Sequence, residues 1–366
     1  MNISEILSKV TNEGASDVFV VAGRPLSYKL HGNIIDLGEK LNPSDTLELV
    51  EGIYELAGGR DKRILETTGD DDFSFAICGM ARYRVNAFRQ RGSLAAVIRV
   101  INFEIPDPAK LCIPERIIDF ANKKKGFVLV TGPAGSGKST TLACMIDHIN
   151  TNRQAHIITL EDPIEYLHSH KKSIVTQREV VTDTDSYLTA LRASLRQSPD
   201  VILLGEMRDY ETMNVAVTAA ETGHLVLSTL HTIGASNTID RIIDAFPAGQ
   251  QRQIAVQLSM VLQAVVSQQL LPTVDGGLIP AFEIMTLTPA IRNMIRESKI
   301  HQIDGMIASS SGDNMITMDN SIYELYKAGI ITDKVALSFA TNPELLEKKI
   351  RLGAPSMDLG KTPWLK

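Results

Sequence analysis

The sequence has few cysteines, few aromatic residues and no long apolar run. Its three cysteines, Cys78, Cys112 and Cys144, stand far apart and include no CxxC pair. This spacing argues against a disulfide framework or a structural zinc site and is typical of a reducing compartment. No apolar stretch approaches the roughly 20 residues that a membrane-spanning helix requires. The N-terminus also lacks the basic and apolar regions of a signal peptide, so we expect a cytoplasmic protein without a transmembrane segment.

Aromatic residues make up 5% of the chain, and the formal net charge is −6. A protein that moves along nucleic acid is expected to carry a basic groove or exposed aromatic rings on which bases stack. The composition therefore disfavours nucleic acid as a partner. The shares of hydrophobic residues (44%) and charged residues (22%) are those of a globular protein. A chain of 366 residues is too long for one compact core, so we expect two domains.

Residues 1–104 are expected to form a small α+β domain. Pro43–Ala57 has the spacing of an amphipathic helix, and the strand-like runs around it are separated by glycine. The predicted strands are Asp17–Ala22, Leu26–Leu30, Asp72–Ile77, Arg82–Phe88 and Ala95–Ile101. Residues 105–114 are predicted to be a linker without regular structure, because they contain Pro106, Pro108 and Pro114.

Residues 115–366 show short apolar runs without alternation, separated by helical segments. This pattern is typical of a parallel sheet with helices on both faces. The runs are Gly126–Thr131, His156–Leu160, Asp200–Leu204 and His224–Thr229. From Gln251 onward the spacing favours helices, which we predict at Gln251–Leu271, Pro289–Glu297, Ser321–Ala328 and Pro343–Arg351. The end of the chain, Ala354–Lys366, has little periodicity and is expected to be loosely held.

The strongest motif is a glycine-rich loop, GPAGSGKST, between the run Gly126–Thr131 and a helical segment. Glycines let backbone N–H groups turn toward phosphate oxygens, a lysine reaches the β- and γ-phosphates, and a hydroxyl ligates Mg²⁺. The alternative, a glycine-rich turn with a surface lysine, is disfavoured by the strand before the loop and the helix after it. We predict ATP and Mg²⁺ as cofactors, held by Gly132, Pro133, Ala134, Gly135, Ser136, Gly137, Lys138, Ser139 and Thr140.

Three further polar segments follow predicted strands, where an open parallel sheet places its ligand site. They read EDPIEY, GEMRD and TGHLVLSTLHT, at residues 161–166, 205–209 and 222–232. Glu206 suits the coordination shell of Mg²⁺, and Glu165 suits activation of the attacking water. Taken singly, each of these carboxylates, like His231, is more often an ordinary surface residue. Their positions at successive strand ends after a phosphate-binding loop favour a catalytic role.

The order of these four segments resembles that of the secretion and type IV pilus ATPase superfamily, and the resemblance extends over nearly the whole chain. It implies a RecA-like P-loop ATPase domain of the α/β class, preceded by a smaller PAS-like α+β domain and ending in a helical region. It also implies catalytic roles for Lys138, Glu165, Glu206 and His231. Ser139 and Glu206 would hold Mg²⁺, Glu206 through water, and His224 is a weaker candidate.

The resemblance implies a homohexameric ring with nucleotide sites near subunit and domain boundaries. An arginine that enters such a site from another domain can stabilise transferred charge. The first candidates are Arg82, Arg84 and Arg99, followed by Arg89 and Arg91. Arg82 and Arg84 also alternate along a predicted strand, so they could simply line its solvated face. Contacts with the phosphates, or between subunits of the ring, could equally be made by Arg178, Arg192, Arg196 and Arg208.

Residues 290–297, AIRNMIRE, resemble the AIRNLIRE segment of PilT-like retraction ATPases. This resemblance implies a motor for pilus retraction and twitching motility. It would dock at the cytoplasmic face of the inner or cell membrane and turn a PilC-like platform protein of the pilus machinery. Ser16–Val20 is closer to the accessory PilU type. A pilus-assembly or type II secretion ATPase, a structural ring with little turnover and a RecA-like nucleic-acid translocase are the further alternatives.

Overall fold

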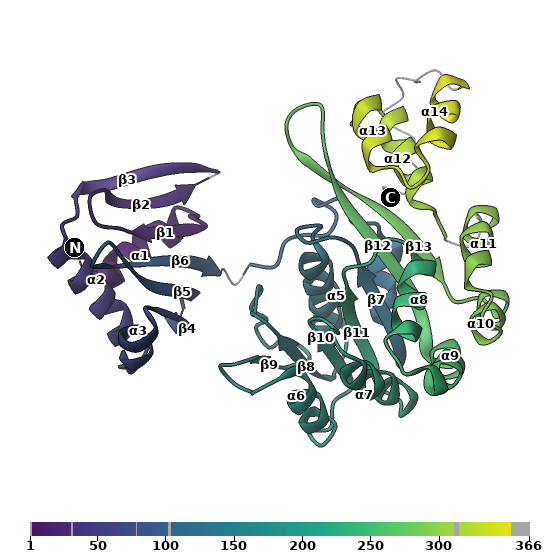
Figure 1. Cartoon of the computed structure of the whole chain (residues 1–366), viewed down its shortest axis with the longest axis horizontal. Coiled ribbons are helices and arrows are strands. Elements are labelled where there is room, and N and C mark those ends of the chain that lie inside the picture. Colours follow the sequence, from purple (N-terminus) through teal and green to yellow (C-terminus); the bar gives the residue numbers. More distant parts are fainter. Residues whose placement is uncertain (1, 31, 78, 102–103, 311–314, 353–366) are drawn as a thin grey trace. The chain divides into compact units, whose positions relative to one another are not determined.

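The computed structural model describes residues 2–30, 32–77, 79–101, 104–310 and 315–352 (Figure 1). The chain divides into two compact units. The first contains Met1–Glu104 and Glu165–Ser169, and the second contains the other described residues from Ile105 onward. None of the helices in these ranges is both long enough and apolar enough to cross a membrane.

The first unit is built on an antiparallel sheet with the strand order β3-β2-β1-β6-β5-β4. Residues along β5 alternate: Tyr83 and Val85 are fully buried, whereas Arg82 and Arg84 are half-buried. This alternation is expected when one face of a sheet is covered. The strands are β1 (Asp17–Val20), β2 (Pro25–Leu30), β3 (Asn33–Lys40), β4 (Asp70–Ile77), β5 (Ala81–Gln90) and β6 (Ser93–Ile101).

Helices α1 (Ile3–Asn12) and α2 (Pro43–Leu56) pack against each other, and α2 lies on β1 and β6. Both begin with a capping box. The side chain of Asn42 accepts hydrogen bonds from the backbone of Ser44 and Asp45, and Asp45 bonds back to the Asn42 N–H. A capping box satisfies N–H groups that the first turn of a helix leaves open. The short helix α3 (Arg63–Thr68) leads into β4.

The second unit contains a sheet of seven strands in the order β13-β12-β7-β11-β10-β8-β9. The expected parallel sheet is confirmed, since all of these strands except β13 run parallel to their neighbours. The first five in chain order are β7 (Gly126–Thr131), β8 (His156–Glu161), β9 (Ile174–Glu179), β10 (Val201–Leu204) and β11 (Leu225–Leu230).

Helices cover both faces of this sheet, as Figure 1 shows. Phe127 and Leu129 of β7 point to one face, and Val128 and Val130 point to the other. The first face is covered by α6 (Tyr187–Ser194), α7 (Tyr210–Glu221), α8 (Ala235–Asp244) and α9 (Ala248–Val261). The second is covered by α4 (Glu115–Ile118), the 3₁₀ turn η1 (Asp119–Asn122) and α5 (Lys138–Asn152).

The prediction of one helix over Gln251–Leu271 is wrong. Helix α9 ends at Val261, β12 (Leu262–Pro272) follows directly, and β13 (Leu278–Thr286) is its antiparallel partner. The other edge of β12 pairs with β7, so most of its side chains are buried on both faces and the usual alternation of a strand is missing. A run without alternation fits a buried helix and a buried strand equally well, and sheet pairing decides between them.

The helices predicted after residue 288 are confirmed. Helices α10 (Pro289–Arg296) and α11 (Ile303–Ser309), with the 3₁₀ turn η2 (Ile300–Gln302) between them, pack near α8 and α9. The outer end of the β12–β13 hairpin shares a separate apolar core with α12 (Met318–Lys327), α13 (Asp333–Phe339) and α14 (Pro343–Leu352) (Figure 1). The expectation for Ala354–Lys366 concerns residues outside the described ranges.

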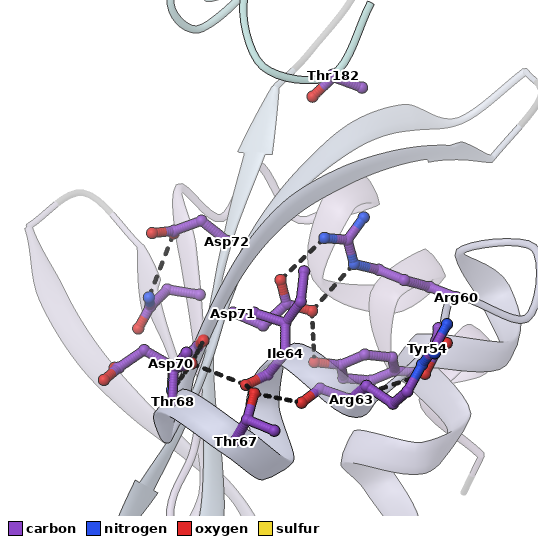
Figure 2. Close-up of polar contacts among 12 residues, drawn as sticks. Tyr54, Arg60, Arg63, Ile64, Thr67, Thr68, Asp70, Asp71, Asp72 and Thr182 are labelled. Carbon is purple, nitrogen blue, oxygen red and sulfur yellow. Dashed lines mark hydrogen bonds and ion pairs between the residues drawn. The ribbon is translucent and has the colours of Figure 1, made fainter.

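A buried carboxylate ties α2 to the edge strand β4 in the first unit. The side chain of Asp71 is 2% exposed and accepts hydrogen bonds from Arg60 Nε at 3.0 Å and Nη2 at 2.9 Å. It also accepts a bond from the Tyr54 hydroxyl at 2.8 Å, and Figure 2 shows all three bonds converging on it. Burial, together with this bond to Asp71, raises the pKa of Tyr54. The buried charge is therefore compensated from two directions.

We expect Asp71→Asn to destabilise the first unit by about 2–4 kcal/mol, because removing one partner leaves the other groups of a buried ion pair uncompensated. Tyr54→Phe is the matched control and should cost less, about 1.5 kcal/mol, because it removes one hydrogen bond to the carboxylate and leaves the ion pair with Arg60 in place. Hydrogen exchange of β5 amides as a function of urea measures this unit separately from the other. Equal effects of the two substitutions would contradict the central role of Asp71.

Candidate nucleotide-binding site

The polar segments predicted to act together follow neighbouring strands of the second sheet. Parallel pairing sets their carboxyl ends side by side, since Thr131 of β7 lies beside Leu230 of β11, and Leu204 of β10 beside Leu160 of β8. The phosphate-binding loop, His231 and the two acidic segments therefore begin at one edge of the sheet. This is where an open α/β sheet binds its ligand.

The loop after β7 has the features of an anion-binding site. Gly135 and Gly137 have φ angles of 75° and 86°, which glycine adopts without strain. Gly137 is the N-cap of α5 and has no side chain. Within the described residues, its position therefore supplies no side-chain hydrogen bond to the first turn of the helix. The hydroxyl of Ser136 is also buried without a hydrogen-bond partner in the described ranges. Backbone N–H groups at the positive end of a helix fit a phosphate group.

Lys138 lies folded over this loop. The residue is 8% exposed, and its Nζ donates to the carbonyl oxygens of Gly132 and Pro133, each at 2.9 Å. A buried ammonium gains more from a charged acceptor than from a neutral carbonyl. The geometry therefore fits a lysine that binds phosphate oxygens once a nucleotide is present.

The loop is pressed against β12. A Cβ atom at Gly132 would lie only 2.1 Å from the carbonyl oxygen of Gln268, and the φ of Gly132 is 142°. The Gln268 side chain is buried and accepts a hydrogen bond from the Thr141 hydroxyl of α5 at 2.7 Å. Gln268 thus fixes both the start of the loop and the helix that follows it.

Glu206 lies beyond the end of β10, in contact with two basic side chains. One carboxylate oxygen accepts from Arg208, and the other is 3.2 Å from His231 Nε2. Burial by itself would raise the pKa of Glu206, but the bonds to Arg208 and His231 outweigh it and hold the pKa below its usual range. The carboxylate is therefore charged at neutral pH and able to attract a hydrated cation.

Glu165 and the predicted arginines of β5 and β6 belong to the first unit, whereas Arg178, Arg192, Arg196 and Arg208 belong to the second. Glu165 is exposed. Arg82 donates to the Ser74 hydroxyl at 2.6 Å, and Arg99 forms an ion pair with Asp17 at 3.1 Å. Lys138, Ser139, Glu206 and His231 all follow strands of the second sheet. The catalytic roles given to all of these residues stay predictions.

His224, in contrast, lies at the amino end of β11, whereas His231 follows its carboxyl end. Its Nδ1 is 2.8 Å from the carbonyl oxygen of Ala219, at the end of α7. The length of the strand separates the two histidines, so His224 is away from the phosphate-binding loop. Its environment is that of a structural residue that closes the α7–β11 turn.

Two residues of the site escape the sequence patterns. Gln268 is hidden because its segment reads as a helix, although the polar triplet Ser267–Gln269 within an apolar run is a usable signal. Tyr187 of α6 is the other: a Cβ at Gly205 would lie 2.8 Å from its hydroxyl, so a larger residue before Glu206 would displace that hydroxyl. Burial raises the pKa of Tyr187. No spacing rule connects Tyr187 to Gly205, because the contact depends on how α6 packs.

A family model described as type II/IV secretion system protein matches residues 80–310. The chain belongs to this family. The type IV pilus retractation ATPase PilT of Pseudomonas aeruginosa is 43% identical over 94% of the chain and 99% of the relative. The type IV pilus ATPase PilU of the same organism is 41% identical over 97% of the chain and 93% of the relative.

A crystal structure of the pilus retraction motor PilT with bound ADP has the same fold. The two structures agree with a TM-score of 0.87 at 46% sequence identity, over 95% of this chain and 99% of the other. This likeness confirms the expected α/β architecture with a smaller N-terminal part and a helical C-terminal region. It also confirms the expected membership of a family of secretion and pilus ATPases.

We expect Gly132→Ala to weaken ATP binding at least about tenfold, because the new methyl group would meet the Gln268 carbonyl and displace the phosphate-binding loop. Gly135→Ala is the matched control: it has a similar backbone requirement, with a φ of 75°, but no atom lies within 4 Å of its added Cβ. Strain there is about 1–2 kcal/mol. Calorimetric titration with ATP gives both affinities. Unchanged binding by Gly132→Ala would rule out this close contact.

The pKa of Glu206 makes a prediction for the pH dependence of ATP turnover. A lowered pKa keeps the carboxylate charged as the pH falls, so Arg208→Ala should raise that pKa and move the acid-side decline of kcat to higher pH. Arg252→Ala, at an exposed position of α9, should leave the profile unchanged. Profiles of kcat from about pH 3.5 to pH 8 test this, because a lowered pKa of Glu206 places the decline of the unaltered chain at the acid end of that range. A decline at the same pH in both variants would show that Arg208 does not control Glu206.

Proposed function

We propose that this chain is an ATP-driven motor that retracts type IV pili and so powers twitching motility. As a member of the type II/IV secretion system protein family, it is an ATPase. The observation that carries the proposal is the similarity, over 94% of the chain, to a pilus retraction ATPase. Residues 1–104 and 115–366 are its two domains in this proposal, with residues 105–114 as the linker.

The proposed chemistry is hydrolysis of the bond between the β- and γ-phosphates. Water attacks the γ-phosphorus and ADP leaves. Glu165 accepts the proton of the water, Lys138 neutralises the developing charge, and His231 contacts the γ-phosphate. The Ser139 hydroxyl and Glu206, the latter through water, would hold Mg²⁺, which would neutralise charge on the phosphates. The ion needs few protein ligands, since Mg²⁺ usually keeps several waters in its coordination shell.

The proposed assembly is a homohexamer in the cytoplasm, docked at the cytoplasmic face of the inner or cell membrane. Arg82, Arg84 and Arg99 are its candidate sensors of bound nucleotide. Successive hydrolysis events around the ring would turn a PilC-like platform protein of the pilus machinery and return pilin subunits to the membrane. The resemblance to pilus ATPases supports this assembly.

Helix α10 supports retraction over other roles. Ile291 and Ile295 are fully buried against the core, whereas Arg292 and Arg296 of the same helix, and Glu297 directly after it, are exposed. Burial of one face accounts for the apolar residues of the AIRNMIRE segment. It does not account for the charged ones. Arg296 donates to Asn293 at 2.7 Å, and Glu297 forms an ion pair with Lys299 at 2.7 Å. Arg292 is the exposed charge that we assign to a partner.

An accessory motor of the PilU type is the second candidate. PilU matches 97% of the chain at 41% identity, almost as well as PilT does. The two roles differ in a cell: loss of a primary motor stops retraction, while an accessory motor adds to a retraction that another ATPase drives.

We expect cells that lack this chain to carry abundant pili that extend and do not shorten. Complementation with Glu165→Gln should not restore retraction, and the purified variant should lose ATP turnover about 10²-fold or more, because the attacking water loses its base. Fluorescent labelling of pili measures retraction, and phosphate release measures turnover. Loss of all pili in the deletion strain would identify an assembly motor instead.

Arg292→Ala tests the role of α10 in retraction. It removes an exposed charge of α10 and leaves the buried face intact, so it should retain ATP binding and the fold while impairing retraction. Glu344→Ala, on the exposed side of α14, should retain all three properties. Loss of nucleotide binding in Arg292→Ala would mean that α10 serves only the fold.

A further inference from the structure

Glu283 of β13 is a buried carboxylate in contact with the first residues of two helices. It is 9% exposed, and its oxygens accept hydrogen bonds from the backbone N–H of Ala235 at 2.7 Å and of Met318 at 3.4 Å. Ala235 begins α8, and Met318 begins α12. The positive ends of two helices therefore face one carboxylate, which stabilises its charge. Burial acts in the opposite direction and raises the pKa of Glu283.

The beginning of α8 depends on side chains from the sheet. Its N-cap is Gly234, with a φ of 90°, which has no side chain to accept from the first turn. The Gly234 N–H donates to the Ser267 hydroxyl of β12 at 3.0 Å, and the next N–H, of Ala235, donates to Glu283. Because a helix start needs acceptors for its open N–H groups, the hairpin β12–β13 takes over the function of a cap.

Helix α8 begins only four residues after His231. The intervening Thr232 is hydrogen-bonded to Thr238 of α8 at 2.7 Å, and Thr238 donates to the Gly234 carbonyl oxygen at 2.7 Å. These bonds connect the segment that follows His231 to the start of α8. Glu283 is in direct contact with that start.

On its other side, Glu283 is connected to the C-terminal helices. Met318 opens α12, and the adjacent Asp319 accepts from the backbone N–H groups of Thr341 at 2.6 Å and Asn342 at 2.9 Å, just before α14. A cavity of about 580 Å³ lies between the starts of α8 and α12 and the helices α13 and α14. Side-chain packing is therefore incomplete at this junction. For this reason the connection between these helices depends more on the polar contacts of Glu283.

We propose that Glu283 is a positioning residue that couples the nucleotide-contacting segment at His231 to the helices α12–α14. Nucleotide binding that shifts His231 would change how firmly Glu283 holds α8, and through the shared carboxylate how firmly it holds α12. The inference rests on nucleotide binding at the phosphate loop and is independent of pilus retraction. It assigns the C-terminal helices a response to the nucleotide state.

Glu283→Gln tests this link with the full-length chain. An amide can accept from only one of the two N–H groups and presents its own N–H₂ to the other, so one helix start loses its acceptor. We compare hydrogen exchange with and without a non-hydrolysable ATP analogue and Mg²⁺. In the unaltered chain, the analogue should slow exchange both at residues 231–238 and at residues 317–325. In Glu283→Gln, the effect at residues 317–325 should disappear.

Turnover supplies the second readout. We expect Glu283→Gln to lower kcat about tenfold with KM within about threefold, since the phosphate loop itself is unchanged. Asp319→Asn is the matched control. It replaces by an amide a carboxylate that accepts from two backbone N–H groups in the same region, and these two groups do not belong to α8. It should speed exchange near residues 341–342 and retain the response at residues 317–325.

Two results would overturn the proposal. One is a nucleotide response at residues 317–325 that persists in Glu283→Gln, which would make Glu283 purely structural. The other is an unaltered chain in which the analogue slows exchange at residues 231–238 but not at residues 317–325. The second result is obtained with the unaltered chain, so the proposal can be tested even if Glu283→Gln does not fold. A chain that does not bind the analogue at all would refute the proposed ATP site itself.

Discussion

The in-register pairing of the inner strands of the second sheet is the constraint on which the site depends. β7, β11, β10 and β8 are hydrogen-bonded as parallel neighbours, and the pairing continues past their ends, where the Gly132 N–H donates to the Leu230 carbonyl at 3.2 Å. A shift of one residue would turn every side chain to the opposite face of the sheet. It would also move His231 and Glu206 relative to the phosphate loop. The buried apolar side chains on both faces hold this register, so the core determines the geometry of the site.

Much of this arrangement can be predicted from the sequence, because the decisive signals are local. The phosphate loop lies between a buried strand and a helix, and glutamate and histidine follow further apolar runs, so strand ends and candidate residues can be derived together. In the first unit, strict alternation identifies β5. Of three successive aspartates the structure buries the middle one, Asp71, which shares the inward face of β4 with Phe73 and Phe75, as strand alternation predicts. The sequence does not show that Arg60 is its partner.

The prediction fails where non-local pairing decides the structure. Leu262–Pro272 has no alternation, and only its position between β7 and β13 makes it a strand. The same error concealed Gln268, whose contact with Gly132 joins residues more than a hundred positions apart. Contacts between residues so far apart in the sequence produce no periodic pattern in it. Contacts of this kind have to be read from the fold.

The polar residues of the β12–β13 hairpin explain why this segment interrupts an otherwise apolar core. Ser267 accepts from the start of α8, Gln268 from Thr141 of α5, and the amide of Gln269 donates to the Phe339 carbonyl at the end of α13 at 3.3 Å. Each would be costly to bury without its partner. One hairpin therefore contacts the helix of the phosphate loop, the helix that follows His231 and the C-terminal helices. Buried polar side chains are retained here because they specify those contacts.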